Sequence, residues 1–97
     1  KVIFNAEIAD GIYRTVFESP EISSSSMPGQ FINILPCSDW QQVMRRPMSI
    51  ASQGNDKISI IYKAVGEGTL IMANWEKGEE VDLIGPFFWY YLKIYNC

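Results

Sequence analysis

The sequence contains no histidine and only two cysteines, Cys37 and Cys97, among its 97 residues. Without histidine, a Ser–His–Asp triad and a histidine-ligated metal site are both excluded. Two cysteines are too few for an iron–sulfur cluster, which needs four ligands, and too few for a disulfide framework. We therefore expect two incidental thiols in a reduced, cytoplasmic protein that holds no metal.

Positive charge is also scarce. Eight Lys and Arg residues stand against eleven Asp and Glu residues, which gives a formal net charge of −3. Nucleic-acid-binding domains are normally basic, so we expect no nucleic-acid partner. No run of about 18 apolar residues is present, and the first residues lack the pattern of a signal peptide, so we expect no membrane span. A chain of 97 residues has the length of one domain.

Apolar and polar residues alternate over much of the chain, which is typical of half-buried β-strands. We expect strands at residues 1–9, 12–18, 31–35, 48–52, 57–65 and 80–84. The polar, Ser-rich segment Pro20–Ser26 is expected to be an exposed loop, and Cys37–Met44 a loop or a single helical turn. One short helix is expected at Thr69–Glu76, capped by Thr69. Short strands with one late helix predict an all-β barrel or sandwich.

The segment Arg46-Pro47-Met48-Ser49 lies where a loop enters a strand. Arg46 offers a planar fork of N–H donors that suits a pair of phosphates. Pro47 has no backbone N–H to satisfy, so a flat ring could lie against it. Ser49 carries a hydroxyl that could reach a ring nitrogen. The same residues equally describe a surface arginine, a proline at the start of a strand and a solvent-facing serine, so this segment alone leaves both interpretations open.

A second candidate segment, Gly66-Glu67-Gly68-Thr69, opens the expected helix. Glycines let backbone N–H groups approach an anion, and the N-terminus of a helix carries a partial positive charge. Thr69 could cap the helix and also bond a phosphate oxygen. A plain strand-to-helix turn explains this segment equally well. If the barrel brings it next to Arg46, the two segments would converge on one dinucleotide.

Four motifs occur in order along the chain, at Pro28–Phe31, Arg45–Ile50, Ile61–Thr69 and Gly78–Pro86. Together they resemble the electron-transfer subunit of bacterial dihydroorotate dehydrogenase type B, in the ferredoxin-reductase superfamily, over Ile8–Pro86. The resemblance implies an all-β, six-stranded antiparallel Greek-key barrel with one short helix, which binds FAD. It also implies a flavoprotein of electron transport and pyrimidine biosynthesis, in which FAD passes electrons between an iron–sulfur cluster and a nicotinamide cofactor.

The resemblance further implies a role for each residue of the first candidate segment. Arg46 would pair with the pyrophosphate of FAD. Pro47 and Met48 would lie beside the isoalloxazine ring. Ser49 would hydrogen-bond the edge of that ring, near its reactive nitrogen.

Two more groups of residues would contact FAD under the same resemblance. Ile61, Tyr62 and Lys63 would line the flavin from the next strand, with Tyr62 near the ribityl chain or the ring. Gly68 and Thr69 would hold the phosphates at the helix N-terminus. No residue is expected to be catalytic, because the flavin itself carries the redox chemistry.

The chain departs from the family pattern after Gly85-Pro86. In the family a Gly-rich stretch follows, leading into a nicotinamide-binding domain and then a Cys cluster, whereas here Phe87–Cys97 is rich in aromatic residues. We therefore expect an FAD-binding barrel domain at residues 1–86 and an aromatic tail at residues 87–97 that does not match the family. Such a chain would not be a complete enzyme alone, and would act with a catalytic dehydrogenase subunit.

An alternative function stays open at this point. The barrel would have lost flavin binding and would act as an association or oligomerisation module. The aromatic residues of Phe87–Tyr95 form an apolar patch that needs a cover. They could dock back on the barrel or form the interface of a homo-oligomer.

Overall fold

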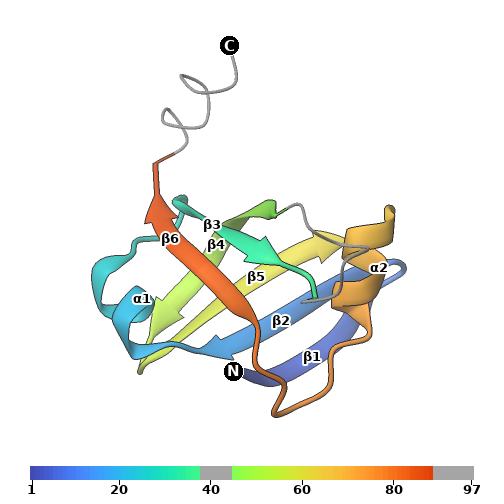
Figure 1. Ribbon diagram of the computed structural model, residues 1–97, viewed down its shortest axis with the longest axis horizontal. Helices are drawn as coiled ribbons and strands as arrows, with labels where there is room; N and C mark the ends of the chain where they lie inside the picture. Colours follow the sequence, from blue (N-terminus) through green and yellow to red (C-terminus); the bar gives the residue numbers. More distant parts are fainter. Residues whose placement is uncertain (38–44, 89–97) are drawn as a thin grey trace.

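The computed structural model describes residues 1–37 and 45–88 (Figure 1). Along the described chain the elements are β1 (Val2–Ala9), β2 (Ile12–Glu18), α1 (Pro20–Ser25), β3 (Phe31–Leu35), β4 (Arg46–Gly54), β5 (Lys57–Lys63), α2 (Glu67–Ala73) and β6 (Asp82–Phe87). Among the residues so described, no helix is long and apolar enough to cross a membrane.

All strand pairings are antiparallel, in the order β1-β2-β5-β4-β3-β6. The connections from β2 to β3 and from β5 to β6 each pass over two other strands, as in a Greek key. Figure 1 shows the sheet curled, with β6 crossing in front of the other strands. Within residues 1–37 and 45–88 no ladder joins β1 to β6. The predicted all-β, six-stranded antiparallel barrel class is confirmed, although over the described residues the sheet is not closed and two helices accompany it rather than one.

The gap between the two edge strands is bridged by the loop that precedes β6. The backbone N–H of Val2 donates to the carbonyl of Glu79 at 2.8 Å, and the N–H of Gly78 donates to the carbonyl of Val2 at 2.7 Å. These bonds give partners to the backbone groups of Val2 on the side of β1 that pairs with no other strand.

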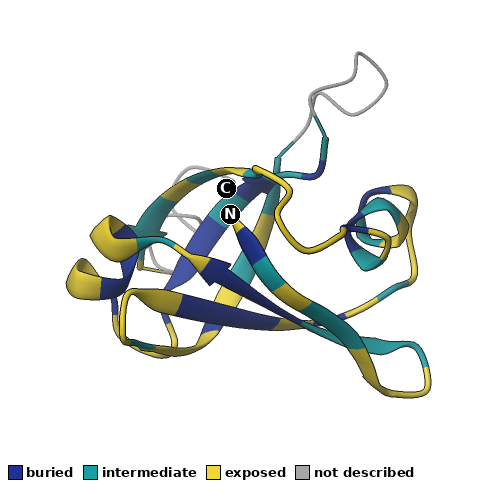
Figure 2. Cartoon of the chain, turned by 90° about the horizontal axis from the view of Figure 1, so that it is seen from below, coloured by how far each residue is buried: buried dark blue, intermediate teal, exposed yellow. Residues whose placement is uncertain are grey.

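The hydrophobic core lies inside the curled sheet. Figure 2 shows buried and exposed positions succeeding one another along the strands, as the alternation of the sequence predicts. The buried core residues are Val2, Phe17, Ile22, Ile32, Ile34, Ile50, Ile58, Ile60, Tyr62, Met72 and Trp75. Phe17 and Trp75 meet edge to face with ring centroids 5.5 Å apart, and Nε1 of Trp75 donates to the carbonyl of Pro36 at 2.9 Å.

The expected exposed loop at Pro20–Ser26 is instead the helix α1. Its first residue is proline, whose missing N–H would have no partner in the first turn of a helix anyway. The hydroxyl of Ser25 donates back to the carbonyl of Glu21 at 2.9 Å. Ile22 is only 8% exposed and packs in the core. Burial of this one isoleucine outweighs the weak helix propensity of the serines around it.

The second helix begins and ends earlier than the sequence predicts. Gly66 is its N-cap, so Thr69 is the third helical residue rather than the cap. The helix ends at Ala73 instead of Glu76. The reason is that the N–H groups of Asn74 and Trp75 bond carbonyls only three residues back, at 3.0 and 3.1 Å, which tightens the chain out of the α-helix.

The last strand also differs from its expected bounds. It begins at Asp82 rather than Glu80 and continues through Gly85-Pro86 to Phe87. Phe87 pairs with Phe31 of β3, and their ring centroids are 5.4 Å apart. Phe87 is therefore part of β6, while the expectations for most of Cys37–Met44 and for the tail from residue 89 onward lie outside the described residues.

Candidate functional site

Strand β4 is divided between two neighbours. Its first residues pair with β3 alone, from Arg46, opposite Ile34, to Ser49, opposite Phe31. Its ladder with β5 begins only at Ile50 and runs to the turn. The end of β5, Ile61–Lys63, pairs with β2 alone. The two strands therefore diverge away from their turn, as Figure 1 shows, and each leaves a backbone edge outside the ladder between them.

The first predicted segment lies on this divergent part of β4. Pro47 and Ser49 are exposed on the outer face of the strand, while Met48 is half-buried and packs against the core. Arg46 is half-buried at the start of the strand. The alternation of a strand thus divides the segment, with Pro47 and Ser49 on one face and Arg46 and Met48 on the other.

The guanidinium of Arg46 lies against Gly68 in the first turn of α2. A methyl group placed on Gly68 would lie 2.8 Å from Nε of Arg46 and 3.2 Å from its Cζ and Nη2. A residue with a side chain at position 68 would require the Arg46 side chain to move, whereas glycine lets the helix and the guanidinium lie this close. The structure therefore brings together two candidate residues that are far apart in the sequence.

This contact joins two sources of positive potential. The guanidinium carries a full charge, and the first turn of a helix points unpaired N–H groups outward. Glu67, in the same turn, is an exposed acidic residue. An anion that touched both would meet positive potential from the guanidinium and from the first turn of the helix.

The hydroxyl of Thr69 is engaged inside its own turn. It accepts the backbone N–H groups of Val65 and Gly66, both at 3.0 Å, and donates to the carbonyl of Gly66 at 3.1 Å. The hydroxyl proton is therefore used in holding the turn between β5 and α2. A contribution of Thr69 to anion binding would come from its backbone N–H.

The three candidate residues on β5 divide between the two faces of the sheet. Ile61 is 49% exposed and Lys63 is exposed, both on the outer face, as are Pro47 and Ser49. Tyr62 is only 6% exposed and points into the core. The structure therefore places Ile61 and Lys63 on the outer face of the sheet, and Tyr62 on the inner face.

Tyr62 takes part in a buried polar cluster. Its ring stacks on Tyr13, with centroids 6.0 Å apart, and its hydroxyl lies 3.1 Å from Oγ1 of Thr15. Burial is the main influence on this phenol and raises its pKa; the hydrogen bond to Thr15 lowers the pKa, and Tyr13 raises it. Tyr62 therefore stays neutral at physiological pH.

Two further residues support the site, although the sequence analysis did not select them. Nη2 of Arg45 pairs with the carboxylate of Asp82 at 3.0 Å, and Nη1 donates to the carbonyls of Asn33 and Asp82 at 3.4 and 3.3 Å. Arg45 thus ties the residue before β4 to β3 and β6. The second residue, Asn5, joins β1 to the end of α2. A polar residue inside the apolar run of β1 is the only sequence signal for it.

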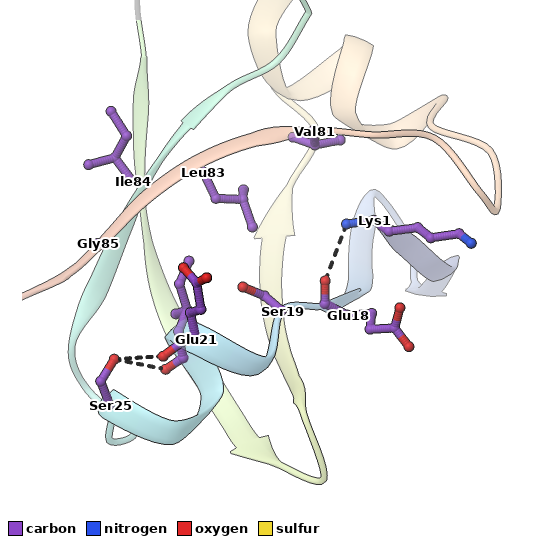
Figure 3. Close-up of a pocket in the computed structure, with 10 residues that line it drawn as sticks. Lys1, Glu18, Ser19, Glu21, Ser25, Val81, Leu83, Ile84 and Gly85 are labelled. Carbon is purple, nitrogen blue, oxygen red and sulfur yellow. Dashed lines mark hydrogen bonds between the residues drawn. The ribbon is translucent and has the colours of Figure 1, made fainter.

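A separate hollow lies between α1 and β6 (Figure 3). It is an open groove of about 560 Å³. Figure 3 shows Leu83 and Val81 beside it on the β6 side, and Glu21 and Ser25 on α1. Among residues 1–37 and 45–88, no cluster of three Cys, Asp or Glu residues could hold a metal ion. The site of interest is therefore the contact between β4 and α2.

The sequence matches no family model. Among curated relatives, the dihydroorotate dehydrogenase B (NAD(+)) electron transfer subunit of Fusobacterium nucleatum is 40% identical over 84 residues, which are 84% of this chain and 32% of the relative. The subunit of the same name from Bacillus velezensis is 38% identical, over 84% of this chain and 33% of the relative. The subunit of the same name from Bacillus pumilus is 38% identical, over 88% of this chain and 34% of the relative.

A solved structure has the same fold. It comes from work on flavin-based electron bifurcation in the NADH-dependent reduced ferredoxin–NADP oxidoreductase. It matches with a TM-score of 0.78 and 24% identity, over 88% of this chain and 31% of that chain. The present chain therefore spans about a third of the length of the proteins it matches. These comparisons confirm the resemblance that the four motifs indicate: over most of its length the chain is similar to one third of the dihydroorotate dehydrogenase B electron transfer subunits, on a ferredoxin-reductase-like fold.

Proposed function

We propose that this chain is the FAD-binding electron-transfer module of a flavin-dependent oxidoreductase. The observation that carries the proposal is the contact between the Arg46 guanidinium and Gly68. It joins the two segments that the sequence analysis selected for phosphate binding. The pyrophosphate of FAD would lie where the guanidinium and the first turn of α2 meet.

The chemistry of this contact fits a pyrophosphate. Arg46 can give two parallel N–H donors to phosphate oxygens, and charge-assisted bonds of this kind are about twice as strong as neutral ones. The backbone of Gly68 and Thr69 presents N–H groups to the same anion without an intervening side chain at position 68.

The divergence of β4 and β5 supports a place for the flavin ring. The edges of Arg46–Ser49 and Ile61–Lys63 that face each other are outside the ladder between these strands, so their backbone groups can serve a ligand. Pro47, Ser49 and Ile61 add exposed side chains there. When bound, FAD supplies the redox chemistry, and these residues hold and orient it.

The names of the relatives support the wider assignment. Each of these relatives is named as an electron transfer subunit of dihydroorotate dehydrogenase B (NAD(+)). We extend this to the present chain as a proposal: its FAD passes electrons between a nicotinamide cofactor and an iron–sulfur cluster held elsewhere, and a catalytic dehydrogenase subunit in the cytoplasm is its partner. No residue of the chain is proposed to be catalytic.

The test is the affinity of the full chain for FAD, measured by quenching of flavin fluorescence. Arg46→Ala should weaken binding by about 1.5–3 kcal/mol, or roughly tenfold to 150-fold, because a charged hydrogen-bond donor is lost. Lys57→Ala removes one positive charge at the far end of β5 and serves as the control. It should change the affinity by less than about twofold. Equal affinities of the Arg46 and Lys57 variants would remove Arg46 from the site.

A further inference from the structure

The outer face of the sheet has a hollow beside the turn between β4 and β5. It measures about 210 Å³ and lies at the end of the sheet opposite to α2 (Figure 1). This volume is below the range of pockets that hold drug-sized ligands, so the hollow suits a small ion or molecule. Its lining residues are Arg14, Val16, Ser52, Gln53, Gly54, Asn55, Lys57, Ile58 and Ser59. None of these residues is acidic, although the chain as a whole carries a net charge of −3.

The strand register shows how the hollow is built. Val16, Ser59 and Ser52 lie opposite one another on β2, β5 and β4, so their side chains form a row across the outer face. Val16 is 9% exposed and Ser59 is 2% exposed, whereas Ser52 is exposed. Arg14 lies two residues from Val16 along β2, on the side away from the turn. The row is therefore the floor of the hollow, and Arg14 stands at one end of it.

The guanidinium of Arg14 is held in place without being neutralised. Its Cζ lies 5.7 Å from the centre of the Phe4 ring, which is a cation–π contact. Over residues 1–37 and 45–88 this guanidinium makes no hydrogen bond and no ion pair. A guanidinium that stacks on a ring keeps the N–H donors at its edge for another partner. Arg14 therefore offers a planar pair of donors to an oxyanion.

The two serines of the floor supply a further donor. Their Oγ atoms are hydrogen-bonded to each other, and neither hydroxyl has a second partner among the described residues. Ser59 is buried, so its proton needs an acceptor inside the protein, and Oγ of Ser52 is the acceptor within reach. Ser52 accepts this bond and keeps its own proton, which it can donate from its exposed position.

The other charged groups near the hollow offset one another. Lys57 lies opposite Glu18 across β5 and β2, and both residues are exposed. Asp56 lies in the turn but does not line the hollow. The residues opposite Arg14, in contrast, are Ala6 on β1 and Ile61 on β5, which carry no charge. The positive charge of Arg14 is therefore the one that the neighbouring strands leave uncompensated.

We propose that this hollow is a binding site for a small oxyanion, a phosphate or a carboxylate group. Arg14 gives two parallel N–H donors to the oxygens, and the hydroxyl of Ser52 gives a third donor from the floor. Phe4 holds the guanidinium from outside the hollow. The site goes beyond the proposed function, because it lies at the other end of β4 and β5 from Arg46 and Lys63.

A titration of the full chain with sodium phosphate, followed by NMR at constant ionic strength, tests the proposal. Phosphate should shift the Nε–H signal of Arg14 and the amide signals of Ser52 and Ser59 in a saturable way, and sodium chloride should not. A parallel titration with sodium acetate tests a carboxylate. Saturation by phosphate, by acetate or by both supports the site and shows which group it takes. Saturation by neither anion would overturn the proposal.

Substitutions of Arg14 separate a built site from a general attraction to positive charge. Arg14→Gln should weaken binding by about fivefold or more, because the charged donors are lost. Arg14→Lys keeps the charge but not the planar pair of donors, so most of that loss should remain. Lys77→Ala removes an exposed charge outside the hollow and should change the affinity by less than about twofold. An affinity in Arg14→Lys equal to that of the unmodified chain would contradict the proposed geometry.

The same titration distinguishes this site from the proposed FAD site. Phosphate bound beside Arg46 would shift the amide signal of Gly68, and Arg14→Gln should leave that shift unchanged while it removes the shifts of Ser52 and Ser59. The two sites are thus read from different signals, and a chain that fails to bind FAD still decides the role of Arg14. Shifts of Ser52 and Ser59 that persist in a folded Arg14→Gln chain would overturn the proposal.

Discussion

At the scale of single residues, the missing side chain of Gly68 matters as much as the charge of Arg46. The helix approaches β4 to a distance at which a methyl group would collide with the guanidinium. No positive φ is required at Gly68, so any preference for glycine there comes from the neighbouring Arg46 side chain and not from the backbone. This makes the contact testable by substitution at either partner.

A double-mutant cycle measures that contact in the unliganded chain. In the Arg46→Ala background, Gly68→Ala should raise the free energy of unfolding by about 0.5–1 kcal/mol, because alanine is the better helix former. In the unmodified background the collision with Nε should cancel this gain or reverse it. Urea unfolding of the four chains gives the coupling energy.

Gly66→Ala is the matched control for this cycle. Nothing lies within 4 Å of a methyl group at Gly66, so the coupling of this substitution with Arg46→Ala should be near zero. A coupling energy at Gly68 as small as that at Gly66 would show that Arg46 does not rest against the helix in solution.

The buried phenol of Tyr62 predicts a pH dependence. Burial raises its pKa in the folded chain, so the folded state holds this proton more tightly than the unfolded state does. Stability is therefore fully present below the unfolded pKa of about 10 and is lost as the pH rises above it. Urea unfolding on either side of about pH 10 should show a smaller loss of stability for Tyr62→Phe than for the unmodified chain. An identical loss in both chains would contradict this assignment.

The sequence selects Arg46 and Gly68 separately, and only the fold shows that they lie side by side. Each residue type suggested phosphate binding, but their juxtaposition depends on how β4 and α2 pack, which spacing along the chain does not encode. The same limit explains why Asn5 and Arg45 were missed: their partners lie 67 and 37 residues away in the sequence. The free hydroxyl expected of Thr69 is used within its own turn.

At the scale of elements, the alternation of apolar and polar residues predicts a strand well where burial on both faces of that strand follows the same alternation. On β5 it places Ile58, Ile60 and Tyr62 on one face, and all three are buried. On β1 a register shift between Val2 and Phe4 breaks the alternation, so Val2 is fully buried while Phe4 is 43% exposed. A bulge of this kind depends on the partner strand, and a single-strand pattern does not reveal it.

Helix α1 lies in a Ser-rich segment whose composition predicted a loop, and its stability depends on one side chain. Ile22→Ala should lower the free energy of unfolding by about 2–3 kcal/mol, as expected for a buried isoleucine. Ser24→Ala, on the exposed face of the same helix, should change it by less than about 0.5 kcal/mol. Urea unfolding measures both, and equal small effects would mean that α1 is not docked on the core.

At the scale of the whole molecule, the described chain is a six-stranded sheet whose last strand ends at Phe87. The tail hypothesis can therefore be tested without damaging β6, by comparing the full chain with a chain that ends at Phe88. If the tail forms a homo-oligomer interface, light scattering should find an oligomer for the full chain and a monomer for the shorter one. Two monomers would leave the tail without that role.

The fold brings Arg46 and the first turn of α2 together, and we propose that FAD binds there. The most direct measurement is a titration of the full chain with FAD, followed by the visible spectrum and the flavin fluorescence. Binding of FAD should give a saturable spectral change and quenching, and ADP, which carries a diphosphate but no flavin, should compete for the same site. An unchanged spectrum and fluorescence up to high micromolar FAD would contradict it.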